Sequence, residues 1–202
     1  IFAFVVLAVA ALVGLARFYP LMAPVGDVIA RVTISGTITT DPERTALLED
    51  LAEDDSVSAV IVAINSPGGT TAGGEELYAS LRALAEQKPV VSTIGELGAS
   101  AAYMAAIATD RIYARNLSIV GSIGVYYQHV DASGLFETLG VDLDKVASGP
   151  LKGKPDFDEP ISPQVRDSLV ELVDSSYRYF VDLVAERRGL TRSDTLALAD
   201  GR

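Results

Sequence analysis

The strongest constraint on the fold is a continuous apolar run from Ser58 to Ile64 that contains no charged residue. Such a run is typical of a parallel strand that is buried on both faces. The segments after it are expected to alternate, with a helix at about 72–87, a strand at 90–94, a helix at 100–108 and a strand at 111–114. This alternation predicts an α/β fold of right-handed βαβ units with a mainly parallel sheet.

The rest of the chain fits the same scheme. Asp41 and Pro42 have the residue types of an N-cap and a first helical position, and Ser162 with Pro163 repeats the pattern. Gly36 is expected to end the first strand. The further elements are expected at these ranges: strands at 28–34, 118–126 and 142–146, and helices at 42–54, 132–139, 163–188 and from 191 onward.

The N-terminal end of the chain has the composition of a membrane segment. Residues 1–16 are uncharged, and the first charge is Arg17. A bilayer-spanning helix needs about 20 apolar residues, and the chain begins without Met, so we expect residues 1–18 to be one transmembrane helix whose start is missing. A cleaved signal peptide is the alternative, but Arg17 and Phe18 are unlike the small residues of a cleavage site. Residues 19–26 are expected to be a linker and 27–202 the catalytic domain.

Composition excludes several classes of function. The net charge is -11, and no basic cluster is longer than Arg187-Arg188, which argues against a nucleic-acid partner. The chain has no cysteine, which excludes thiol catalysis and cysteine-ligated zinc, and its one histidine excludes a multi-histidine metal site. We therefore expect neither a metal nor another cofactor.

A candidate nucleophile lies in the small-residue stretch Gly98 to Tyr103, directly after the predicted strand at 90–94. A serine at a strand-to-helix turn exposes its hydroxyl, and backbone N–H groups beside it can bind an oxyanion. Ser100 is the serine of this stretch. The same composition also suits a helix packed tightly on a sheet, so the stretch alone leaves both interpretations open.

The second requirement is a base. His129 is adjacent to Val130 and Asp131, but nothing in the sequence constrains its position. Lysine is the other base that activates serine. Lys152 and Lys154 lie in the glycine- and proline-rich loop 148–159, which is long enough to fold over a site, although a solvated loop is the alternative. A lysine base must be neutral, so its pKa has to be lowered by burial.

Taken together, the motifs resemble the signal peptide peptidase A family, membrane-anchored Ser/Lys proteases whose domain is related to the ClpP and crotonase folds. The resemblance covers about residues 28–202. It rests on the following five segments in this order: Asn65-Ser66-Pro67-Gly68-Gly69, Gly98-Ala99-Ser100-Ala101-Ala102-Tyr103, Gly121-Ser122-Ile123-Gly124-Val125, Ser148-Gly149-Pro150-Leu151-Lys152 and Ala199-Asp200-Gly201-Arg202.

The resemblance implies a role for each matching residue. Ser100 corresponds to the nucleophile, Lys152 to the general base, and Ser122 to a hydroxyl that orients the lysine. Gly69 and Ala101 would supply the oxyanion N–H groups. Lys154 remains the rival base. In the family the chain continues past Asp-Gly-Arg, so we expect the C-terminal part of the domain to be missing here.

The resemblance also implies a function and a location. It implies an endopeptidase tethered in the bacterial inner membrane, with its catalytic domain on the extracytoplasmic side. This enzyme would cleave apolar peptides such as remnant signal peptides through an acyl-enzyme. The short form of the family implies a homo-oligomeric ring in which assembly completes the active sites. The resemblance leaves open whether Ser100 and Lys152 come from one subunit or from neighbouring subunits. The alternatives are a catalytically silent membrane scaffold of the same fold and a crotonase-type acyl-CoA enzyme, which the Ser/Lys pair and the anchor disfavour.

Overall fold

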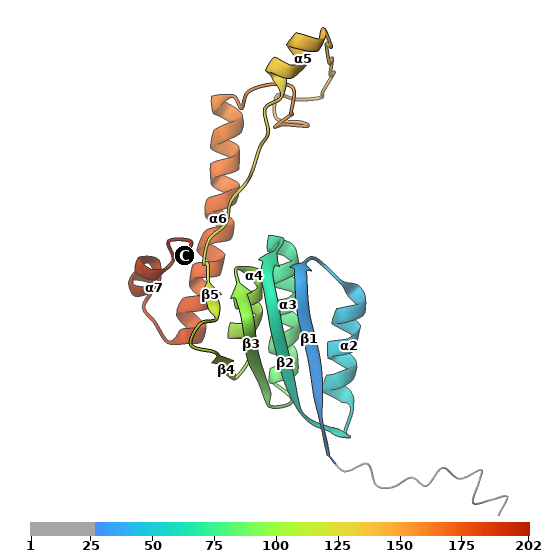
Figure 1. Ribbon diagram of the computed structural model, residues 1–202, viewed down its shortest axis with the longest axis vertical. Helices are drawn as coiled ribbons and strands as arrows, with labels where there is room; N and C mark the ends of the chain where they lie inside the picture. The colour runs from blue at the N-terminus through green and yellow to red at the C-terminus, as the bar shows by residue number, and fades with distance from the viewer. Residues whose placement is uncertain (1–26) are drawn as a thin grey trace, which may run out of the picture.

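The computed structural model describes residues 27–202 (Figure 1). The predicted anchor at 1–18 and linker at 19–26 lie outside these residues. Within residues 27–202, no helix is both long and apolar enough to span a bilayer.

The centre of the fold is a parallel sheet. Its strands β1 (Val28–Ile38), β2 (Val57–Gly69), β3 (Val90–Ala99) and β4 (Arg111–Ala114) lie in chain order. The short β5 (Ile119–Gly121) also pairs with β3. It can do so because β4 pairs only with the first half of β3 and leaves Leu97–Ala99 available. Every strand pair is parallel, which confirms the predicted α/β class.

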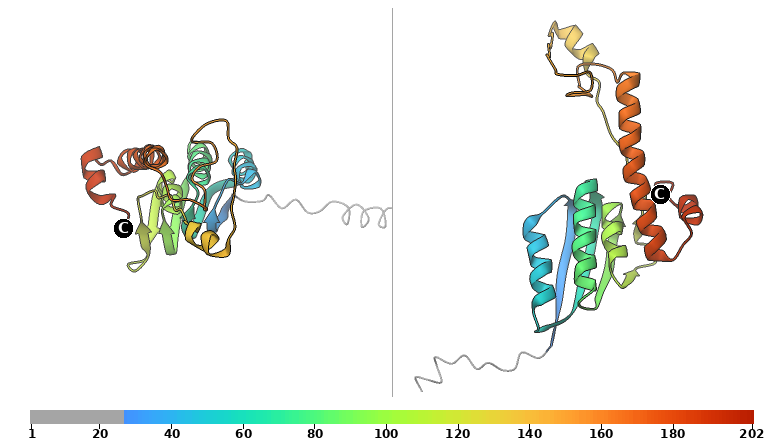
Figure 2. Two further views of the ribbon diagram at one scale, coloured as in Figure 1. Left: turned by 90° about the horizontal axis from the view of Figure 1, so that it is seen from above. Right: turned by 180° about the vertical axis from the view of Figure 1, so that it is seen from behind.

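Three crossover helices, α2 (Pro42–Glu53), α3 (Thr71–Ala85) and α4 (Ala101–Ala108), cover one face of the sheet (Figure 2). As predicted, Asp41 caps α2 by accepting a hydrogen bond from the Arg44 N–H. Leu77 and Leu81 of α3 are fully buried against the strands. Burial of one such leucine contributes about 1.5–3 kcal/mol. These contacts hold the strand ends that form the site.

The opposite face of the sheet differs from the expectation. Among the described residues, Arg31 and Thr33 of β1 are exposed there, and Ile61 of β2 is only partly buried. The prediction that residues 58–64 are buried on both faces is therefore wrong for the part of the chain described. The physical reason is that α2, α3 and α4 all pass over the same side (Figure 2).

Several predicted strands are also wrong in extent. β2 and β3 run past their expected ends at 64 and 94, to Gly69 and Ala99. β1 continues through Gly36, because the strand takes up a register shift between Ser35 and Thr37 at the glycine, whose φ is +67°. The strand expected at 118–126 is confined to β5, since no neighbouring strand pairs with the residues that follow it. Residues 142–146, expected as a strand, have no regular structure and lie away from the sheet.

The chain then leaves the body of the protein as a projecting arm, which we define as residues 126–162 (Figure 1). The arm contains α5 (Ser133–Leu139), and the chain returns through α6 (Pro163–Arg188) to α7 (Arg192–Leu198). The second half of α6 is fixed to the body by buried Phe180 and Val184. Its first half extends with the arm beyond the sheet.

Candidate active site

Ser100 lies at the turn between β3 and α4, in a backbone conformation that residues other than glycine rarely adopt. Its φ is 54° and its ψ is -124°. The turn is held on both sides, because the Ser100 N–H donates to the Gly121 carbonyl oxygen at 2.9 Å and the Ser100 carbonyl accepts from the Met104 N–H at 3.0 Å. Such strain costs about 1–3 kcal/mol and persists only where the surroundings impose it. A sharp strand-to-helix turn of this kind exposes the side chain at its tip.

Two glycines at the end of β2 approach neighbouring backbone closely, Gly68 at the Ser100 turn and Gly69 at β1. A Cβ on Gly68 would lie 2.7 Å from the Ser100 Cβ, and one on Gly69 would lie 1.8 Å from the Ile38 carbonyl oxygen. Only a backbone without side chains can approach so closely. The end of β2 is therefore in contact with the Ser100 turn.

These segments surround a cavity of about 350 Å³ that is lined in part by Ser100, Gly69 and Ala101. Ala101 is the first residue of α4, and the first N–H groups of a helix have no partner within it. The positive end of the helix dipole lies at the same point. A hydroxyl and a helix N-terminus suited to negative charge thus share one cavity.

We predict that Gly68→Ala lowers kcat/KM for a peptide substrate by about 10²-fold, because the new Cβ would displace Ser100 and a shift of about 1 Å in a reacting group has such an effect. Steady-state kinetics would measure it, with circular dichroism to verify folding. Gly189→Ala is the matched control, because Gly189 also has a positive φ, of +65°, and a Cβ there meets nothing within 4 Å. Unchanged activity in a folded Gly68→Ala variant would contradict the close approach.

Ser122 follows β5 directly and also has a positive φ, of 50°. Its N–H donates to the Arg202 carbonyl oxygen at 2.5 Å, and its hydroxyl donates to the Gly201 carbonyl oxygen at 3.2 Å. The preceding residue, Gly121, accepts the hydrogen bond from Ser100. Ser122 is therefore linked to the nucleophile turn by one residue of backbone.

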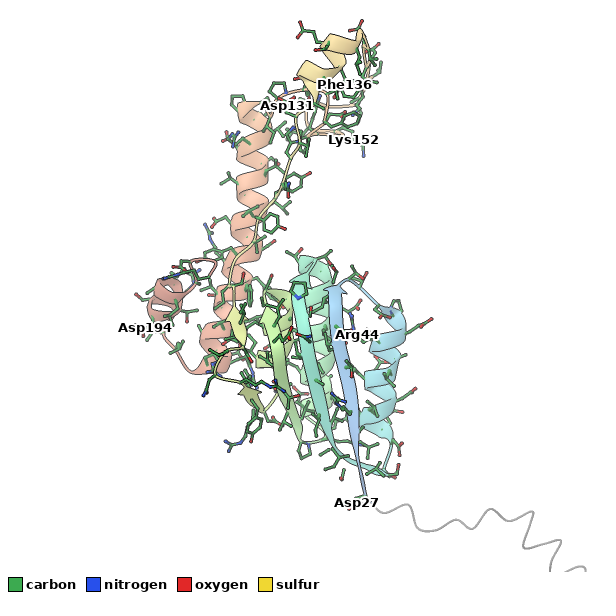
Figure 3. All side chains as sticks on the ribbon, in the orientation of Figure 1. Asp27, Arg44, Asp131, Phe136, Lys152 and Asp194 are labelled. Carbon is green, nitrogen blue, oxygen red and sulfur yellow. The ribbon has the colours of Figure 1, made fainter. Side chains whose placement is uncertain are left out.

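Lys152 lies far from this cavity, in the loop at the end of the arm (Figure 3). Its side chain is exposed, and its N–H closes a turn by donating to the Gly149 carbonyl oxygen at 3.1 Å. Within one subunit, Lys152 therefore does not reach Ser100. The first half of α6 and the irregular segment after Ser122 hold the loop that contains Lys152 beyond the sheet.

The structure separates the two candidate lysines by their contacts. Lys154 forms an ion pair with Glu159. Lys145 is paired with Asp156, and Lys88 donates to the Asp54 carbonyl. Within residues 27–202, Lys152 is the lysine whose ammonium has no hydrogen bond or ion pair. His129 also belongs to the arm, where its Nε2 lies 3.3 Å from the Glu159 carbonyl oxygen.

Sequence reasoning missed the contact between Ser122 and the C-terminal turn 199–202. The two are 79 positions apart, so no local pattern indicates that they meet. The glycines Gly121, Gly124 and Gly201 were the available signal, because they mark where backbones approach closely.

Comparison with known proteins identifies the family of the chain. The model of Peptidase family S49 matches residues 82–202. A candidate protease of Methanocaldococcus jannaschii is 38% identical over 77% of this chain and 50% of its own length, and one of Synechocystis is 36% identical over 86% and 63%. A candidate signal peptide peptidase SppA of Enterococcus faecium is 31% identical over 77% and 45%. The chain thus spans about half to two thirds of the length of these relatives.

Among solved structures, a ClpP1 mutant from Listeria monocytogenes superposes with a TM-score of 0.51 over 84% of this chain and 78% of that one, at 14% identity. This likeness concerns the fold alone and shows that the fold is ClpP-like. The family match covers more than half of the chain, and it includes Ser100, Ser122 and Lys152. The chain therefore belongs to peptidase family S49, with relatives of the signal peptide peptidase A type.

Proposed function

We propose that this protein is a membrane-anchored serine endopeptidase that hydrolyses apolar peptides, remnant signal peptides among them, with a dyad of Ser100 and Lys152. The observation that supports this best is the strained turn of Ser100 beside the N-terminus of α4 and the cavity that they share. Strained backbone conformations cluster at active sites, and a nucleophile at a strand-to-helix turn has such a conformation.

In the proposed reaction, Ser100 Oγ attacks the peptide carbonyl while the neutral Lys152 amine takes its proton. The N–H groups of Gly69 and Ala101 stabilise the oxyanion. The lysine ammonium then protonates the leaving amine, and an acyl-enzyme remains. Water attacks the ester while the neutral Lys152 amine takes its proton. The lysine ammonium then gives that proton to the departing Ser100 Oγ, which releases the acid product and restores both residues.

The arm supports a dyad assembled from two subunits. Lys152 and Ser100 are widely separated in one chain, and the arm exposes many apolar side chains, including Val130, Leu135 and Val146. An exposed apolar surface of this kind is typical of a protein interface. A neighbouring copy that receives the arm would bury Lys152 near Ser100, and burial disfavours the charged form of a lysine. Repetition of this heterologous contact closes a ring.

The preference for apolar peptides is supported by a groove of about 980 Å³ beside the Ser100 cavity. Gly124 and Val125 line both, so the two spaces adjoin. Ile123, Leu169 and Val173 give the groove an apolar wall. The uncharged residues 1–16 support anchoring in a membrane. The bacterial inner membrane and the extracytoplasmic side of the catalytic domain are what the family resemblance implies.

The direct test is labelling of the full-length protein in detergent with a fluorophosphonate, followed by mass spectrometry of the modified peptide and an assay on an apolar fluorogenic peptide. We expect one modified residue, Ser100, and loss of cleavage in proportion to labelling. An assembled protein that neither reacts nor cleaves would favour the catalytically silent scaffold instead.

A further inference from the structure

The turn Asp200-Gly201-Arg202 is a built structure that is fixed to the body of the protein. The residue before it, Ala199, is 4% exposed and accepts a hydrogen bond from the Tyr177 hydroxyl at 2.6 Å. The Asp200 carboxylate closes the turn by accepting from the Arg202 N–H at 3.2 Å and from its Nε at 2.7 Å. The position of the Gly201 and Arg202 carbonyls is therefore determined by the turn.

Glycines bring this turn into contact with the end of β5 and with the residues directly after it. A Cβ on Gly121 would lie 3.2 Å from the Arg202 carbonyl oxygen, and one on Gly124 would lie 3.4 Å from the Gly201 Cα. Gly201 itself has a φ of +91°, which glycine adopts at little cost. Both carbonyls of the turn consequently reach Ser122, one at its N–H and the other at its hydroxyl.

The direction of the Ser122 hydroxyl has a chemical consequence. Because its proton is donated to the Gly201 carbonyl, its oxygen retains only acceptor capacity. A neutral lysine has one lone pair, which it needs for the proton of the nucleophile. A serine with a free proton could donate to that lone pair and block it, whereas a serine that only accepts binds the lysine N–H groups and leaves the lone pair available.

We infer that Asp200, Gly201 and Arg202 form a positioning element for catalysis, in which the Gly201 carbonyl binds the Ser122 proton and so makes Ser122 a pure acceptor for the lysine base. This inference rests on the proposed Ser/Lys function. It assigns a role to the Asp-Gly-Arg turn that involves no contact with the substrate.

The test is a double-mutant cycle of Gly201→Ala and Ser122→Ala in the full-length protein. A Cβ on Gly201 meets nothing within 4 Å, so the substitution disturbs only the backbone conformation. We expect Gly201→Ala alone to lower kcat about tenfold to hundredfold, the effect of one hydrogen bond to a charged group. In the Ser122→Ala background we expect no further loss, because the turn acts through that hydroxyl.

The pH profile of kcat/KM gives a readout that a structural role would not change. Ser122→Ala removes an acceptor for the lysine N–H groups, and Gly201→Ala frees a serine proton that binds the lysine lone pair. Both changes favour the neutral amine over the ammonium, so the acidic limb should move to lower pH in both variants. Hydrogen bonds from Arg202 already lower the pKa of Asp200, so Asp200 stays ionised near neutrality and the movement belongs to another group.

Gly189→Ala is the matched control, because that glycine also has a positive φ and open space, at the far end of α6. Asp200→Ala, at an exposed side chain, repeats the test if Gly201→Ala does not fold. Equal losses in both backgrounds, or an unmoved pH profile, would overturn the inference. Failure of the proposed function itself would be seen separately, as an unlabelled Ser100 or an active Lys152→Ala variant.

Discussion

Replacing Ser100 with alanine is expected to lower kcat/KM for an apolar peptide by about 10³–10⁶-fold, because loss of the nucleophile leaves only the oxyanion site and substrate binding. Kinetics in detergent would measure the loss. The matched control is Ser80→Ala, since the Ser80 hydroxyl bonds only to the Glu76 carbonyl of its own helix. A Ser100→Ala variant with normal activity would refute the assignment of the nucleophile.

The same position tests whether the backbone is strained for function. With φ at 54°, a glycine at position 100 removes the steric cost. Ser100→Gly should therefore be inactive and yet about 1 kcal/mol more stable than the native protein in chemical denaturation. A loss of stability on this substitution would indicate that the turn is not strained.

Lys152→Ala is expected to abolish cleavage to a similar degree, whereas Lys154→Ala should keep most of the activity. The reason is that Lys154 is already paired with Glu159, while the Lys152 ammonium has no such partner among the described residues. Comparison of the two variants by kcat/KM separates the rival bases. Loss only in Lys154→Ala would move the base by two residues.

Coexpression of the two inactive variants then tests whether the dyad is shared. Subunits with Ser100→Ala retain Lys152, and subunits with Lys152→Ala retain Ser100. In a one-to-one mixture, random assembly places an intact serine beside an intact lysine from its neighbour at about a quarter of the sites. We expect about a quarter of native activity in the mixed assembly. A mixture as inactive as its parents would mean that one subunit supplies both residues.

Much of the architecture could be predicted from local patterns. The apolar runs and the helices between them indicated a parallel sheet, and the start of α6 at Pro163 followed from Ser162, which caps it by accepting from the Val165 N–H. These features depend on contacts within a few residues, so their signals are local. The uncovered face of the sheet could not be predicted in this way, because the side on which a helix crosses depends on the whole chain.

The candidate site likewise has features that local sequence predicts and features that it does not. The small residues around Ser100 indicated a strand-to-helix turn, because a backbone in close contact with Gly68 leaves no room for side chains. The strain at Ser100 itself is imposed from outside the turn by the hydrogen bond to Gly121. The positive φ of Ser100 therefore could not be predicted from the sequence around it.

The sequence by itself determined the fold class, the helix caps and the identity of the candidate nucleophile, since each depends on residues that are neighbours along the chain. Only the tertiary structure decided that Lys152 lies on a projecting arm away from Ser100 and that Ser122 meets Gly201 across 79 positions. Such contacts form because the sheet and α6 bring distant segments together, and no local propensity encodes the distance between them.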